Sequence, residues 1–183
     1  MSTDVTLSIT ESDLYKALGE FLQGLFVDVE IERTQQNGIP MPQGEFIAMT
    51  SLNSAGLSTG VVNYTAPASA GMGQQHITRT TRWDCQLDFY GAGAERNALL
   101  LATLFRSEYS TDAFRRGGAV LAPLYCSDPR QTTMINGEQQ YEPRWTLDVQ
   151  AQINPVVSAP LAFFDNVTIH PIPVESLDGN SNQ

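Results

Sequence analysis

The chain has 183 residues and is 42% hydrophobic, which suits one domain with a substantial core. Its formal net charge of −10 is opposite to that of proteins that grip nucleic acid through a basic surface. Two cysteines, Cys85 and Cys126, are too few for a disulfide framework, so we expect two reduced thiols in or near the core.

The first 25 residues predict an amphipathic helix. They lack a basic segment followed by an apolar run, and no stretch of the chain approaches the roughly 18 apolar residues of a membrane span. We therefore expect a protein that stays in the cytoplasm where it is made. Thr10 and Asp13 have the spacing of a capping box, and apolar residues including Leu18 and Phe21 then recur at helical intervals up to Leu25.

Two strands are expected after this helix. Residues 27–32 alternate between apolar and acidic side chains, which is typical of a half-buried strand. The Pro40, Met41 and Pro42 segment forces an extended path, and residues 45–52 form the next strand.

Residues 53–75 differ in composition, because they are rich in serine, glycine, alanine, threonine and asparagine. Long insertions without strong apolar periodicity are uncommon inside compact domains and are often functional. We interpret this one as an extended β-arm or a loop that orders on a neighbour, with a short strand at residues 60–64. A surface loop without fixed structure is the alternative.

One long strand and a second helix follow. Residues 77–90 alternate, with Trp83 and Phe89 on the apolar face and Asp88 on the polar face. Residues 94–108 have the periodicity of a helix with Phe105 on its apolar stripe. Residues 110–116 predict a short helical turn, capped by serine at position 110 and stopped by two glycines.

A hairpin-like unit comes next. An apolar run at residues 120–125 precedes a polar excursion and the Asn136-Gly137 dipeptide, which favours a tight turn. The strand after it alternates strictly, with Trp145, Leu147 and Val149 on its apolar face.

After residue 155 the chain is proline-rich. Phe163 and Phe164 are its only strong anchors, and residues 167–170 are a short strand candidate. We predict an α+β fold: a mostly antiparallel twisted sheet with two main helices packed on one face, plus the long loop or β-arm and an extended C-terminal tail. The domain spans residues 1–155, with the insertion at about 53–75, and the tail spans 156–183.

The sequence predicts no catalytic, cofactor-binding or metal site. Its two histidines lie in different segments, and no nucleophile, zinc or phosphate-loop motif occurs. Asp128, Arg130, Glu138 and Glu142 form a charged group near the hairpin, best interpreted as a solvated loop with ion pairs. A small hydrolase using Asp128 or Glu142 is the alternative. The core candidates are Leu18, Phe21, Trp83, Phe89, Phe105, Trp145, Leu147 and Val149.

Several spaced motifs resemble the neck or tail terminator proteins of tailed bacteriophages. They are residues 37–42 (NGIPMP), 46–50 (FIAMT), 86–91 (QLDFYG), 122–130 (APLYCSDPR), 136–142 (NGEQQYE) and 144–145 (RW). They occur in the right order, and the resemblance covers roughly residues 14–155. It implies a structural virion protein of the tail or neck, without enzymatic activity.

The resemblance further implies a ring, usually a hexamer, at the head-proximal end of the tail tube. Such a ring stops tube polymerisation, joins the tail to the head connector, and meets the sheath if the tail is contractile. DNA would pass through its lumen without specific binding. The alternative within the neck is another head–tail connector or tail-completion subunit.

The polar strand faces and the arm also suit a subunit of a closed ring. We expect subunit contacts at two places in the chain. The interface candidates are Pro40, Met41, Pro42, Asp128, Arg130 and Arg144.

Overall fold

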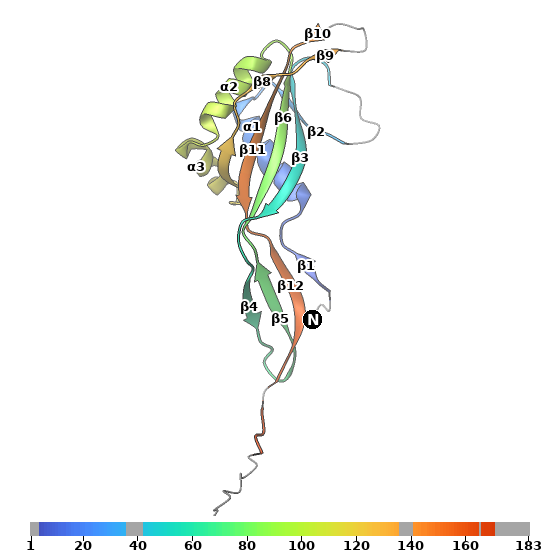
Figure 1. Cartoon of the computed structure of the whole chain (residues 1–183), viewed down its shortest axis with the longest axis vertical. Coiled ribbons are helices and arrows are strands. Elements are labelled where there is room, and N and C mark those ends of the chain that lie inside the picture. Colours follow the sequence, from blue (N-terminus) through green and yellow to red (C-terminus); the bar gives the residue numbers. More distant parts are fainter. Residues whose placement is uncertain (1–3, 36–41, 136–140, 165, 171–183) are drawn as a thin grey trace, which may run out of the picture.

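The computed structural model describes residues 4–35, 42–135, 141–164 and 166–170. It is an elongated molecule in which a helix-covered main domain continues into a narrower β-sheet arm (Figure 1). The elements are β1 (Thr6–Leu7), α1 (Glu11–Leu25), β2 (Glu30–Arg33), β3 (Phe46–Gly56), β4 (Val61–Thr65), β5 (Gly71–Thr78), β6 (Thr81–Tyr90), α2 (Ala94–Leu104), α3 (Glu108–Arg116), β7 (Ala122–Cys126), β8 (Arg130–Gln131), β9 (Met134–Ile135), β10 (Tyr141–Glu142), β11 (Arg144–Ile153) and β12 (Val156–Phe163).

The main domain is built on a sheet with the strand order β2-β3-β6-β11-β7, with β8 also paired to β11. All these pairs are antiparallel except the parallel pair β2–β3. The helices pack on one face of this sheet, which confirms the predicted α+β class. The described part of the chain contains the two predicted main helices, and the short helical turn predicted at residues 110–116 is a third helix, α3.

The core lies between the helices and the apolar face of the main sheet. Tyr15 on α1 meets Trp83 on β6 edge to face at 6.0 Å, and Phe21 contacts both Phe105 and Phe114. Of the predicted core residues, Trp145 is half-buried against this cluster. The other seven are buried: Leu18, Phe21, Trp83, Phe89, Phe105, Leu147 and Val149.

Helix α1 begins with the predicted capping box. The Thr10 hydroxyl accepts from the Asp13 backbone N–H, and the Asp13 carboxylate accepts from the Thr10 backbone N–H. The strand expected at residues 27–32 begins only at β2, because a turn in which the Val29 N–H donates to the Phe26 carbonyl follows the helix. Val27 is consequently 77% exposed.

The long strand predicted at residues 77–90 is two strands in two different sheets. It breaks at Arg79 and Thr80, where the chain passes from β5 in the arm to β6 in the main sheet. The sequence does not reveal this break, because apolar and polar residues alternate with a period of two both before it in β5 and after it in β6. The arm sheet has the order β1-β12-β5-β4, which confirms a β-arm within residues 53–75. Residues 53–56, however, still belong to β3 of the main sheet.

The second predicted helix ends four residues earlier than predicted, and the helical turn after it begins earlier. Helix α2 ends at Leu104, and α3 begins at Glu108, two residues before the predicted start. Ser110 is not its cap: it is buried, and its hydroxyl donates to the Leu104 carbonyl at 2.8 Å. The helix stops at Gly117 and Gly118 as predicted, the latter with a φ of +99° that favours glycine.

The C-terminal region is more ordered than its proline content indicated. Val156–Phe163, placed by the prediction in an extended tail, form β12 and pair with β5 over eight residues. Phe163 is half-buried, but Phe164 is 88% exposed and anchors nothing. Residues 167–170 form no strand. Pro40, Met41 and the Asn136-Gly137 turn lie outside the described residues.

Candidate functional site on the polar face of the main sheet

The face of the main sheet opposite the helices gathers most of the polar residues singled out in the sequence. Strand register places Asp88 beside Thr146, Gln86 beside Asp148, and Thr146 beside Arg130. Because side chains alternate along a strand, these residues lie on one face while Leu87 and Leu147 enter the core. We call this surface the polar face.

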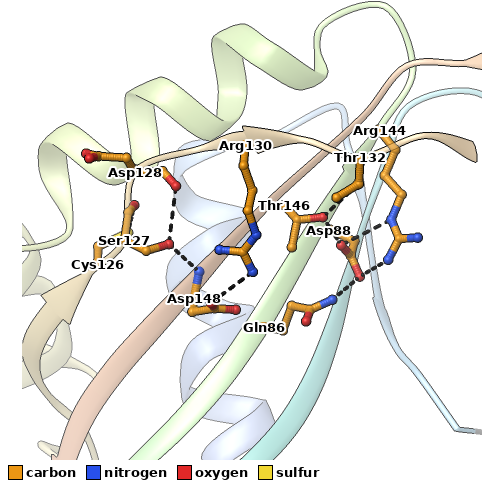
Figure 2. A network of polar contacts seen from close by, with 10 residues as sticks. All are labelled: Gln86, Asp88, Cys126, Ser127, Asp128, Arg130, Thr132, Arg144, Thr146 and Asp148. Atoms are coloured by element: carbon orange, nitrogen blue, oxygen red, sulfur yellow. Dashed lines mark hydrogen bonds and ion pairs between the residues drawn. The ribbon is translucent and has the colours of Figure 1, made fainter.

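Asp88 is the centre of the polar face, although it is only 3% exposed. Its carboxylate accepts from the Thr146 hydroxyl at 2.5 Å and from Gln86 Nε2 at 2.9 Å. Arg144 donates to both of its oxygens, through Nε at 3.2 Å and Nη2 at 2.9 Å (Figure 2). A buried carboxylate is tolerated when it is paired and hydrogen-bonded in this way.

Arg144 is held from two sides. Its hydrogen bonds with Asp88 raise the pKa of its guanidinium further above the ordinary range. Its guanidinium carbon also lies 5.6 Å from the centre of the Tyr90 ring, which stacks on Phe46 at 4.2 Å. The arginine therefore links the charged network to an aromatic pair at one end of the sheet.

A second pair lies farther along β11. Arg130 on β8 contacts the Asp148 carboxylate at 3.0 Å. The hydroxyl of Ser127 accepts from the Asp148 backbone N–H at 2.9 Å and so ties the end of β7 to β11 (Figure 2). Both arginines among the interface candidates thus join the same face, through separate aspartates.

The charge of the polar face is nearly balanced. Arg82 pairs with Asp84 at 2.8 Å, so three arginines on β6, β8 and β11 each contact an aspartate. Register also places Glu30 and Glu32 of the edge strand β2 on this face. Burial, together with the neighbouring Glu30 carboxyl, raises the pKa of Glu32. Five carboxylates against three guanidiniums leave the face mildly negative.

The remaining candidates lie around this face. Asp128 is exposed in the turn between β7 and β8. Pro42 and Glu142 line a groove of about 630 Å³ near β9, together with Met134 and Ile135. Asp128 does not line that groove, so the two carboxylates of the hydrolase alternative are not brought together there.

Metal ligands and reactive thiols are the remaining features to consider in the described part of the chain. The described residues contain no group of three or more side chains able to hold a metal ion. Cys85 and Cys126 are buried free thiols, as predicted, and burial raises the pKa of each to about 12. What the geometry offers is a paired, rigid polar surface.

The alternation of residues 77–90 predicts Asp88 on a polar face but gives no partner for it. The missing information was register, because Thr146 and Thr132 become members of the network only when β6, β11 and β8 are aligned. Matching polar alternation in the two predicted strands was the available signal.

Comparison with known families decides what kind of protein carries this face. A sequence profile described as phage neck terminator protein matches residues 12–177, which is nearly the whole chain. The chain belongs to the phage neck terminator protein family. No curated protein matches it.

Membership gives this neck terminator a structural role in joining tail and head, in association with other tail and head proteins of the virion. None of the helices in the described part of the chain is long and apolar enough to span a membrane. The match also extends past β11 to include the arm strand β12 and residues beyond it.

Proposed function

We propose that this neck terminator forms a closed ring, of six copies, at the head-proximal end of the tail tube. There it stops tube polymerisation and joins the tail to the head connector, and it meets the sheath if the tail contracts. Its partners are further copies of itself, the tube protein and the connector or neck protein.

The observation that carries this proposal is the arm. Register places Leu7, Val62, Tyr64, Ile77, Val157, Leu161 and Phe163 on one face of the arm sheet. Yet Gly73 is the only buried residue in the four described strands of the arm. A sheet with one apolar face is stable when another layer covers that face, so the arm fits a subunit that is completed by neighbours.

The charges of the polar face are the argument that DNA passes through the lumen of the ring without specific binding. Each arginine of this face already contacts an aspartate, and carboxylates outnumber guanidiniums. Such a surface has little to offer a phosphate backbone, which proteins bind through unpaired lysines and arginines. We infer that the polar face lies toward the lumen, and that Asp128, Arg130, Arg144 and the Pro40–Pro42 segment lie near subunit contacts.

Two measurements test the terminator role. The mass of the purified protein, followed by negative-stain imaging of the same fraction, should reveal a species of six copies with a central hole. A monomer in solution moves the test to tails, because a ring can close on a tube tip. Particles made without this protein should then carry over-long tubes that do not join heads.

The measurement on tails also separates the terminator role from the alternative role of a connector or tail-completion subunit. Tubes of normal length that fail to join heads would assign the protein to a connector or tail-completion role. Tubes of normal length that join heads normally would overturn both roles.

A further inference from the structure

The arm sheet ends at β4 on one side, and no other described strand pairs with the outer edge of β4. Strand β4 lies at the end of the order β1-β12-β5-β4, and all five of its residues are exposed. Its sequence, VVNYT, contains no charge and no proline, two of the features with which proteins protect an edge. An open edge of this kind is a template for another strand.

The chain also contains a strand-like segment without a sheet. Residues 166–170 alternate in the pattern of a strand, with Val167 and Ile169 on one side and Thr168 between them. They pair with no strand in the described part of the chain. Val167 is 75% exposed and Ile169 is 80% exposed, and the segment runs away from the tip of the arm (Figure 1).

The segment cannot reach β4 of its own chain. It follows Phe163, which pairs with Gly71 on β5, so the free side of β4 lies three strand spacings away, about 14 Å. The three residue steps from position 163 to position 166 span at most about 11 Å. Thr65 is the end of β4 nearest the tip, and it pairs with Gln74, three residues along β5 from Gly71. The segment would therefore also have to run back along the arm to reach β4.

The opposite edge of the arm is a poorer acceptor. Strand β1 already pairs with Val157 and Ser158, and the Ser8 N–H donates to the Val156 carbonyl. Farther along β12, Pro160 has no N–H to offer a new strand. The edge of β4 is therefore the better site for an added strand.

We propose that residues 166–170 of one copy add as a fifth strand to the edge of β4 in a neighbouring copy. The five residues match the five of β4, and Thr168 falls opposite Asn63 on the polar side of the arm. Val167 and Ile169 then extend the apolar side beside Val62 and Tyr64. Each copy gives one segment and accepts another, which is a head-to-tail contact that can close into a ring. That closure rests on the proposed function, whereas the strand addition rests on the arm itself.

Two full-length variants, Asn63→Cys and Thr168→Cys, test the contact when they are mixed under oxidising conditions. A disulfide between the two chains, identified by peptide mass spectrometry, is expected. The matched control mixes Thr168→Cys with Glu20→Cys, whose site is exposed on α1 in the main domain. A yield no higher than in the control would overturn the proposal. The Asn63→Cys/Thr168→Cys double variant gives a second check. A disulfide between positions 63 and 168 of the same chain in that variant would also overturn the proposal.

Hydrogen exchange gives an independent readout on unmodified protein. Backbone amides of β4 should exchange at least about tenfold more slowly in the assembled protein than in dilute monomer, the factor that corresponds to 1.4 kcal/mol. The Val167→Pro/Thr168→Pro variant removes two consecutive N–H groups, so one needed for pairing is lost in either register. It should lose this protection, and unchanged protection of β4 would overturn the proposal.

The same variant separates this contact from the terminator role. A normal ring and tubes of normal length in Val167→Pro/Thr168→Pro particles would overturn the strand addition and leave the terminator role intact. Cross-linked chains in particles whose tubes do not depend on this protein would support the strand addition and overturn the terminator role.

Discussion

Arg144 on β11 forms a bidentate ion pair with Asp88 on β6, with Nη2 2.9 Å from Oδ2 and Nε 3.2 Å from Oδ1. The contact is diagonal, since Arg144 is directly opposite Tyr90 in the ladder. It joins β6 and β11, two neighbouring ten-residue strands of the main sheet, on the face away from the helices.

Replacing Arg144 should destabilise the protein strongly. Arg144→Met leaves the carboxylate of Asp88, whose side chain is only 5% exposed, without a counter-charge. Breaking a buried ion pair from one side costs about 3 kcal/mol or more in free energy of unfolding, measurable by urea titration.

Arg115→Met is the matched control for this experiment. Arg115 pairs with Asp112 on the surface of α3 and is 70% exposed. Its replacement should cost less than about 1 kcal/mol. Equal losses in the two variants would show that the Asp88 pair contributes no more than a surface contact.

The capping box of α1 should make stability depend on pH. The Thr10 hydroxyl donates to the Asp13 carboxylate at 2.6 Å and lowers the pKa of that carboxyl below its ordinary value of 3.8. The native state therefore favours the ionised form, and its contribution is present above pH 4 and lost as the pH falls further. Thr10→Ala should lower the free energy of unfolding by about 1 kcal/mol at pH 7.

The comparison with wild type at low pH checks the cause. The difference between wild type and Thr10→Ala should shrink as the pH falls below 3.8, because the Asp13 carboxyl of the unfolded chain then takes up a proton before the native one does. A difference that stays constant between pH 7 and pH 3 would contradict a role for the Asp13 carboxylate.

The two cysteines should be unreactive in the native protein. Burial raises the pKa of Cys85 and Cys126 to about 12, so almost no thiolate is present at pH 8. A chromogenic disulfide reagent should titrate no thiol quickly in native protein and two in denaturant. Above pH 9 the unfolded thiols ionise first, so stability should fall as the pH rises toward 12. Rapid native labelling would contradict this burial.

Gly73→Ala should disturb the arm and leave the main domain intact. A Cβ at this position would lie 2.4 Å from the Thr65 carbonyl oxygen and 2.6 Å from the Phe163 ring. Hydrogen exchange should therefore speed up in β4, β5 and β12 and stay unchanged in β6 and β11.

Gly24→Ala is the corresponding control in α1. A Cβ there has no atom within 4 Å, and alanine favours a helix over glycine by up to about 1 kcal/mol. Its arm should exchange as in wild type. Faster exchange spread over the whole molecule in Gly73→Ala would show that arm and main domain unfold together.

The sequence alone determined the local elements of the main domain. Period-two alternation located β11 and the buried face of β6, and helical spacing after Thr10 located α1. These signals are reliable because each residue's burial follows from its position along one element. The family resemblance was likewise readable from spaced motifs.

Only the tertiary structure decided where strands change sheets and which polar residues meet. The chain passes from the arm sheet to the main sheet at Arg79 and Thr80. Apolar and polar residues alternate both before and after this point, so the sequence pattern does not mark it. Asp88, Thr146 and Arg144 meet because β6 and β11 align in one register. Partners far apart in the chain are chosen by packing and pairing across the sheet, and a single strand's pattern contains neither.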